Sequence, residues 1–471
     1  MTTKSKQEAM LIQKAAELFP QAREALLELL AIPSVEGEPE KDAPFGREVA
    51  RALQKTADLA EKLGLCVNLT SYYLTVDLGE TDGADALGIL SHIDVVPFGE
   101  GWSFSPCGQT NGEKIYGRGA LDDKGPTIAS LFALAAVKQS GLQLARPVRM
   151  IIGGNEESGC RCIKQYAAEQ PAPAFGFSPD ADFPVIFAEK GILLLNATCK
   201  APQGKLQGAV GGTVINAVPG KAQAILKDMD IHEATLLLRQ NFPDKMEAEE
   251  LQIIATDNNG LQLTAIGKAA HGSMPEKGIN AVSSLLKALM CLPLNEDEAA
   301  VCRSISRLFG SYYLGIGCGT ACSDEVSGPL TMNLGTLKVQ DGVWQLGLDV
   351  RYPVTASFAD IWRKLSENAA ANRITLEINE HKEPLYVPVD SKPAAELLAL
   401  YREYDEKAEP MAIGGGTYCR AFKNFVAFGP LRPGSADLMH QADEYITTED
   451  LRFLLEIYTL AVWRLAGQPC Q

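Results

Sequence analysis

Residues 86–97 read Ala-Leu-Gly-Ile-Leu-Ser-His-Ile-Asp-Val-Val-Pro, and this stretch decides the fold class. Its first part, Ala86–Leu90, is a short apolar run, which predicts a buried strand. His92 and Asp94 follow directly, two residues apart. An imidazole and an acid just after a buried strand are typical of a site at the edge of an α/β sheet.

Two further apolar runs are followed by acids in the same way. Glu156 and Glu157 come after Val148–Ile152, and Asp180 comes after Ala174–Phe177. Strands that alternate with helices predict α/β layering with a mostly parallel sheet, in which ligands collect beyond the carboxyl ends of the strands. The helical patterns between these strands cover residues 127–139 and 162–169.

Five segments, far apart in the chain, each carry one part of a possible ligand set. Together they offer two histidines and several carboxylates, which is what a pair of hydrolytic zinc ions binds, with oxygen ligands shared between them. Alone, each acidic segment is more often a solvated loop, so the hypothesis rests on their joint presence. The segments are SHIDVVP (91–97), GRGALDDKGP (117–126), GGNEESG (153–159), FSPDAD (177–182) and ADLMHQADEY (436–445).

Two of these segments contain adjacent acids. Asp122 and Asp123 lie in a loop bounded by glycines, and one such carboxylate can bridge two cations through its two oxygens. Glu156 and Glu157 point in different directions if their loop is extended. One of them can then hold a metal while the other acts as general base on the attacking water.

The remaining acids and His440 leave alternatives open. Asp94 can either accept the second ring N–H of His92 or orient its own loop. Asp180 is the first candidate for a terminal metal ligand, and Asp182 is its competitor. His440 is flanked by acids, but an isolated histidine of this kind is more often structural.

The chain is too long for one core, so two domains are expected. From residue 184 the predicted strands are longer and more alternating, and a hairpin with a glycine-containing turn covers residues 330–352. After this region the α/β pattern returns. Because His440 must meet the early segments in space, we expect a discontinuous catalytic domain, residues 1–183 and 385–471. Residues 184–384 form an inserted α+β lid domain, long enough for two lobes.

The insert contains two further candidates. His271 lies in the segment GKAAHGSMP (267–275) after a predicted strand, and it is a candidate electrophile that would stabilise an oxyanion. Arg351, at the end of the hairpin, could clamp a substrate carboxylate bidentately. A surface ion pair is the more common role for such an arginine. His232 and His381 have no comparable context, and we interpret them as structural or surface residues.

The composition argues against several classes of protein. With 43 basic and 59 acidic side chains, the net charge of −16 disfavours nucleic-acid binding. The N-terminal residues show no apolar signal core, and the apolar stretch Ile128–Val137 is too short to span a bilayer. The eleven cysteines lack zinc-site spacing and are expected as free thiols. We therefore expect a cytoplasmic protein without membrane or nucleic-acid partners.

In order and content, the segments resemble the aminoacylase/dipeptidase family of co-catalytic zinc metallopeptidases. The match runs from Ile32 to Tyr445 and covers nearly the whole chain. Its most specific parts are SHIDVVP, GRGALDDKG, NEESG and HGSMPEKGINA. The long insert, the MNLG segment (332–335) and the MHQADEY ending look like the bacterial peptidase V type, the Xaa-His or carnosinase-like dipeptidases.

The resemblance implies a metal-binding role for five residues. His92 and Asp180 would bind one zinc ion, and Glu157 and His440 would bind the other. Asp122 would bridge the two ions, and it would be followed by a cis peptide bond.

The resemblance also implies the residues that act on substrate. Glu156 would be the general base, and Asp94 would support the nearby histidine ligand. In the insert, His271 and Asn216 would polarise the scissile carbonyl, and Arg351 would hold the free carboxylate of the substrate. The backbone N–H groups of a glycine-rich loop would help to bind that carboxylate, namely Gly414, Gly415, Gly416 and Thr417.

The expected activity is hydrolysis of dipeptides with a free amino terminus, by a water between two zinc ions that Glu156 deprotonates. Manganese or cobalt could replace zinc. The alternatives are an N-acyl-amino-acid deacylase or a carboxypeptidase of the same family and, in another class, a non-catalytic metal-binding relative. The insert is long enough to bring His271 over its own active site, which favours a monomer.

Overall fold

The computed structural model describes residues 5–256, 260–310 and 313–467, and the chain forms two compact units. The first unit comprises residues 1–188, 385–411 and 417–471. The second comprises residues 189–384 together with a short loop, residues 412–416. Within the described ranges, no helix has both the length and the apolar character that crossing a bilayer requires.

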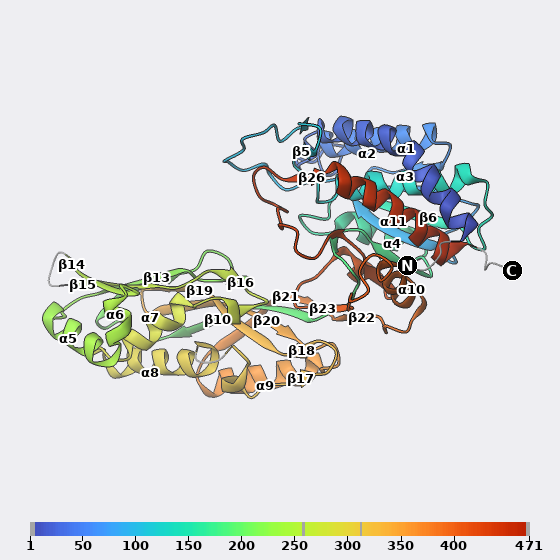
Figure 1. Ribbon diagram of the computed structural model, residues 1–471. Coiled ribbons are helices and arrows are strands. Elements are labelled where there is room, and N and C mark those ends of the chain that lie inside the picture. The colour runs from blue at the N-terminus through green and yellow to red at the C-terminus, as the bar shows by residue number, and fades with distance from the viewer. Residues whose placement is uncertain (1–4, 257–259, 311–312, 468–471) are drawn as a thin grey trace. The chain divides into compact units, whose positions relative to one another are not determined.

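The first unit is built on a mixed sheet with the strand order β1-β2-β6-β3-β7-β24-β9-β22 (Figure 1). The central strands β6, β3, β7 and β24 are parallel, whereas β1, β2 and β9 pair antiparallel at the flanks. β3 and β6 are buried along their whole length, as expected for strands covered on both faces. The α/β fold with a mostly parallel central sheet is thus confirmed. The strands are β1 Cys66–Leu69, β2 Tyr73–Leu78, β3 Leu87–His92, β6 Val148–Gly153, β7 Phe175–Ser178, β9 Ile186–Glu189, β22 Leu385–Tyr386 and β24 Phe425–Ala427.

Helices cover this sheet. α3 and α11 pack against β3, α2 packs against β1 and β2, and α10 packs against β24 and β7. α1 lies on α3 and α11, so α3 is enclosed and its residues 124–137 are all buried. This explains why α3 is apolar on every side. The helices are α1 Lys6–Leu30, α2 Arg47–Lys62, α3 Lys124–Ser140, α4 Arg161–Glu169, α10 Lys392–Tyr401 and α11 Thr448–Ala466.

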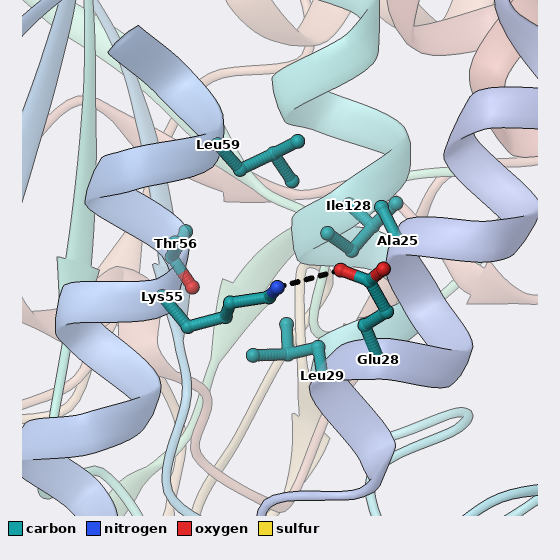
Figure 2. Close-up of a pocket in the computed structure, with 7 residues that line it drawn as sticks. All are labelled: Ala25, Glu28, Leu29, Lys55, Thr56, Leu59 and Ile128. Atoms are coloured by element: carbon teal, nitrogen blue, oxygen red, sulfur yellow. Dashed lines mark ion pairs between the residues drawn. The ribbon is translucent and has the colours of Figure 1, made fainter. Parts of the chain in front are cut away.

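The N-terminal segment forms one helix, α1, which begins with a capping box between Ser5 and Glu8. An ion pair between Lys55 of α2 and Glu28 of α1, 2.6 Å long, joins the two helices (Figure 2). The gap beside this pair is lined by α1, α2 and α3 and has a volume of about 10 Å³. A gap of that size holds about one water molecule, so it is not a ligand site.

The second unit is built on an antiparallel sheet with the strand order β14-β15-β13-β11-β19-β20-β10-β21 (Figure 1). α7 packs on β13, β15 and β19, and α9 packs on β21. The predicted hairpin is present as β19 and β20, and its turn residues Asp341 and Gly342 both have positive φ. The strands are β10 Gly191–Lys200, β11 Leu206–Gly211, β13 Lys221–Leu226, β14 Leu251–Thr256, β15 Gly260–Ile266, β19 Thr331–Gln340, β20 Val343–Tyr352 and β21 Thr375–Lys382. The helices are α5 Ile231–Asn241, α6 Pro243–Glu247, α7 Ala281–Leu289, α8 Glu296–Ile305 and α9 Phe358–Ala371.

Some element boundaries differ from the predictions. β3 extends to His92, so this histidine is the last residue of the strand and not part of the following loop. α10 ends at Tyr401, where the chain turns and Arg402 Nε donates to the carbonyl of Ala408. The flanking strands β1 and β2 were not predicted, since β1 is short and half exposed and contains a polar Asn68.

Glu298 anchors the start of α8. Its side chain is buried, and its carboxylate accepts backbone N–H bonds from Gly204, Lys205 and Leu206 at 2.9, 3.1 and 2.9 Å. It also closes a capping box with Asn295. One buried acid thus satisfies the donors of the segment that leads into β11, and these donors would otherwise be buried without partners.

Glu298→Ala should therefore destabilise the second unit by about 3 kcal/mol, since several buried N–H donors lose a charged acceptor. The measurement is urea unfolding followed by tryptophan fluorescence, because Trp344 lies in the core of this unit. Glu296→Ala is the matched control, since that glutamate is in the same helical turn but exposed. Equal midpoints for the two variants would contradict the role assigned to Glu298.

Candidate metal centre

The carboxyl ends of three neighbouring parallel strands bring the predicted ligands together. His92 ends β3, Glu156 and Glu157 follow β6, and Asp180 follows β7. Because β6, β3 and β7 are adjacent and parallel, their carboxyl ends lie at one edge of the sheet. Two sets of side chains there could hold a cation, with ligand atoms within 4.8 Å of one another. The sets are His92, Glu156 and Asp180, and His92, Asp122 and Glu157.

Asp122 lies between two histidines. Its Oδ1 is 3.1 Å from Nε2 of His92, and its Oδ2 is 2.9 Å from Nε2 of His440. The same His440 nitrogen is 3.2 Å from Oε2 of Glu157, and Asp180 Oδ2 is 3.5 Å from Nε2 of His92. The structure therefore brings together all five predicted metal ligands. Asp182, the predicted competitor of Asp180, belongs to the short strand β8 (Ala181–Asp182).

The backbone fixes the tautomer of His92. Its Nδ1 lies 3.0 Å from the backbone carbonyl oxygen of Asp94, which can only accept a hydrogen bond. Nδ1 therefore carries a proton. Against the effect of burial, the carboxylates of Asp180 and Asp122 raise the pKa of His92, so Nε2 offers a lone pair once a cation has displaced its proton. A lone pair facing two carboxylates is stable only when a cation or a proton lies between them, which fits a metal site.

The carboxylate of Asp94 mainly orients the glutamate loop. It accepts the backbone N–H groups of Glu156 and Glu157 at 3.0 and 3.1 Å, whereas its distance to His92 Nδ1 is 3.5 Å. The loop that Asp94 binds is thus that of the two glutamates and not its own. Both the backbone carbonyl and the carboxylate of Asp94 lie near Nδ1 of His92.

A cis peptide bond joins Asp122 to Asp123, as the resemblance implies. Asp123 is fully buried. Its Oδ2 accepts hydrogen bonds from the hydroxyl of Ser91, from the hydroxyl of Thr127 and from the backbone N–H of His92. Asp123 therefore links the start of α3 to the end of β3 and helps to hold the ligand residues next to these two elements.

Glu444 holds the loop that carries Asp122, and the sequence did not predict this role. Its Oε1 accepts the backbone N–H groups of Gly119, Leu121 and Asp122, and its Oε2 accepts Arg118 Nη1 at 2.7 Å. Its side chain is fully buried. In the sequence, Glu444 is one of three acids that flank His440. No pattern distinguishes it from the other two, so its role could not be predicted.

The site gathers more carboxylates than imidazoles in a partly buried space. Burial raises the pKa of Glu156 to about 8 and also raises the pKa values of Glu157 and Asp180, and neighbouring carboxylates add to these shifts. Hydrogen bonds to Asp122 and Glu157 raise the pKa of His440 to about 10. Oε1 of Glu157 is buried and has no hydrogen-bond partner among the described residues. Divalent cations would stabilise exactly such carboxylates, so the donor set fits a metal centre.

The candidates of the second unit gather around a short strand pair. β12 (Ala217–Val218) pairs with β16 (Ala270–His271) and places Ala217 opposite His271. The backbone N–H of Gly272 donates to the carbonyl of Asn216 at 2.7 Å. His271 and Asn216 are therefore neighbours, and both are exposed. Gly415 and Gly416 lie in the loop 412–416 of the same unit.

Arg351 is paired with an acid that the sequence analysis missed. Its Nε and Nη2 donate to the two carboxylate oxygens of Asp349 at 2.6 and 2.9 Å, and both side chains are buried. Its Nη1 donates to the carbonyl of Gly414 at 3.1 Å. One edge of the guanidinium is thus occupied, and a substrate carboxylate would meet the remaining N–H groups of Nη1 and Nη2. The sequence does contain a signal for this pair, because Asp349 lies two residues before Arg351 and therefore on the same face of the strand.

The sequence profile described as peptidase family M20/M25/M40 matches residues 88–464. The chain belongs to this family. A Bacillus subtilis protein named "Putative dipeptidase YtjP" is 37% identical over 436 residues, which is 90% of this chain and 92% of the relative. A Staphylococcus epidermidis protein named "Putative dipeptidase" is 33% identical over 467 residues, 96% of this chain and 98% of the relative.

Solved structures of low sequence identity share the fold of this M20 peptidase. The aminoacylhistidine dipeptidase from Vibrio alginolyticus has a TM-score of 0.58 at 14% identity, covering 95% of this chain and 97% of its own. Human carnosine dipeptidase 1 has a TM-score of 0.58 at 14% identity, covering 98% and 99%. The resemblance drawn from the sequence motifs is confirmed. The chain is an M20 metallopeptidase, a hydrolytic enzyme of a family that uses divalent metal ions.

Binding of a divalent cation by this M20 peptidase should release protons. With pKa values of about 10 for His440 and about 8 for Glu156, both groups hold protons at neutral pH until a cation competes for the site. The apparent affinity for zinc should then rise as pH increases, by about tenfold per pH unit for each proton released. Calorimetry in buffers of different ionisation enthalpy measures the number of protons. A binding heat independent of the buffer would contradict this prediction.

Proposed function

We propose that this M20 peptidase is a metal-dependent dipeptidase that hydrolyses dipeptides with a free amino terminus. The observation that carries the proposal is the carboxylate of Asp122, whose two oxygens face two different histidines. A carboxylate in this position suits two cations bound side by side. The names of the relatives point to dipeptides as the substrate class.

The contacts support one division of the ligands between two cations. His92 and Asp180, which are in contact, would hold one cation, and Glu157 and His440, also in contact, would hold the other. Asp122 would contribute one oxygen to each. Zinc is the cation that this mixture of imidazole and carboxylate donors favours, and manganese or cobalt are the alternatives.

Glu156 is the proposed general base. When bound, the two cations would make the attacking water more acidic, polarise the scissile carbonyl and lower the pKa of Glu156. Glu156 takes a proton from the water and donates it to the leaving nitrogen. The backbone of Glu156 is fixed in position, because the N–H groups of Glu156 and Glu157 both donate to the carboxylate of Asp94.

The proposed roles of the second unit concern the substrate. His271 donates a hydrogen bond to the developing oxyanion, and the side chain of Asn216 assists it. Arg351 binds the free carboxylate through the N–H groups that Asp349 and Gly414 leave available. Backbone N–H groups of the loop with Gly415 and Gly416 complete the carboxylate site.

We also propose that the enzyme acts as a cytoplasmic monomer. The length of the second unit supports the monomer, because it leaves room for His271 to serve the active site of its own chain. No disulfide bond joins any of the ten cysteines among the described residues, which is typical of a reducing compartment.

Removal and return of the metal tests the substrate class. The stripped enzyme should be inactive, and zinc or manganese should restore cleavage of dipeptides, including one with an N-terminal β-alanine. Tripeptides and N-acetyl amino acids are the comparison substrates, assayed by release of free amino acid. Cleavage of acyl-amino acids alone would replace the dipeptidase by a deacylase, and binding of metal without any cleavage would favour a non-catalytic relative.

Glu156→Gln should lower kcat by about 10³-fold, because the amide cannot accept the proton of the attacking water. Metal content, measured by mass spectrometry, should stay the same. Glu113→Gln is the control, since that glutamate of the first unit is exposed and should leave activity unchanged. Loss of bound metal in Glu156→Gln would instead make Glu156 a ligand, a role that its position beside His92 and Asp180 also permits.

A further inference from the structure

Two polar groups of Ser273 contact the same nitrogen of the His271 ring. The backbone N–H of Ser273 donates to Nδ1 of His271 at 3.2 Å, and the hydroxyl of Ser273 lies 2.7 Å from the same nitrogen. Among the described residues, Nε2 of His271 has no hydrogen-bond partner. Both contacts are therefore made at one side of the ring, and the other side is left for a ligand.

The main-chain contact decides which ring nitrogen carries the proton. A backbone N–H can only donate, so Nδ1 of His271 must be the acceptor and has a lone pair. In the neutral ring the proton then lies on Nε2, and the hydroxyl of Ser273 also donates to Nδ1. We infer that Ser273 is a positioning residue that fixes His271 as the neutral tautomer with Nε2–H directed outward. The catalytic consequence rests on the proposed function, in which this N–H meets the oxyanion.

The surrounding charges favour the same neutral ring. The charged groups that act on His271 are Arg351 and Asp349, both on β20. Burial lowers the pKa of His271, and the cationic Arg351 lowers it further against the smaller opposite effect of Asp349. The carboxylate of Asp349 is bound by Arg351 through two hydrogen bonds, so its negative charge is largely offset by the guanidinium.

The turn that contains Ser273 is closely packed, so its hydroxyl is held in place. A Cβ atom at Gly272 would lie 2.5 Å from Oδ2 of Asp349 and 2.7 Å from the carbonyl oxygen of Asn216. A Cβ atom at Gly414 would lie 3.0 Å from Cβ of Ser273. The backbone N–H of Met274 closes the turn on the carbonyl of His271 at 3.0 Å.

Nitrogen NMR of the protein labelled with ¹⁵N-histidine tests the tautomer directly. The chain has five histidines, and His271→Gln identifies the signals of His271 by their loss. We expect Nδ1 to have the shift of an unprotonated nitrogen and Nε2 that of a protonated one at neutral pH. Ser273→Ala should increase the population of the other tautomer, because it removes the shorter contact, that of the hydroxyl, and leaves only the backbone N–H at Nδ1. A protonated Nδ1 in the wild-type protein would overturn the inference.

Kinetics of the metal-loaded enzyme then test the consequence. Ser273→Ala should lower kcat by about tenfold, the effect of one lost hydrogen bond, with little change in KM. Ser273→Thr retains the hydroxyl and should restore kcat. Ser366→Ala is the matched control, because the hydroxyl of that serine, as far as the described residues show, donates only to the carbonyl of Trp362 in its own helix. Circular dichroism verifies that each variant is folded.

The two proposals fail in different ways. If the wild-type enzyme cleaves dipeptides but Ser273→Ala alters neither the nitrogen shifts nor kcat, the positioning role of Ser273 is wrong and the proposed function stands. If the wild-type enzyme cleaves no dipeptide, the proposed function is wrong. The nitrogen spectrum still decides the tautomer, because it requires no turnover.

Discussion

The position of one carboxylate, that of Asp122, is the constraint on which the rest of the site depends. Its two oxygens lie 3.1 and 2.9 Å from the ring nitrogens of His92 and His440, which are far apart in the chain. Glu444 sets this geometry, because it follows His440 closely and its carboxylate binds the backbone N–H of Asp122. The loop that supplies one histidine thus also holds the acid that the histidine contacts. A displacement of Glu444 would therefore alter both contacts at the same time.

The fold also explains why the centre needs cations from outside the protein. Parallel strands end at one edge of the sheet, and the acids that follow β6 and β7 are therefore held close together and partly buried. The cationic side chain of Arg118 is already bound to Glu444. Glu157 retains a buried oxygen without a partner among the described residues. Divalent cations can replace the protons that these groups hold, so the carboxylates gathered by the fold favour cation binding.

Much of this arrangement could be predicted from the sequence, for a definite physical reason. A buried apolar run followed by His92, Glu157 or Asp180 specifies both the residue and its place at a strand end. Glu444 and Asp349 could not be predicted in the same way. Each acts on groups whose positions only the folded chain reveals, namely backbone N–H groups distant in sequence and a buried guanidinium. Short, half-exposed strands such as β1 also lack the apolar pattern that would reveal them.

Two histidines of this chain show how backbone groups assign different chemistry to the same ring. His92 has its Nδ1 beside a carbonyl oxygen, which accepts, so Nε2 presents a lone pair as a metal ligand must. His271 has its Nδ1 beside the N–H of Ser273, which donates, so Nε2 presents a proton as an oxyanion donor must. The two imidazole rings are chemically identical, so the difference in tautomer comes from the backbone group beside Nδ1. In each case a main-chain atom two residues further along the chain favours one tautomer, and that tautomer is the one that the proposed role of the ring requires.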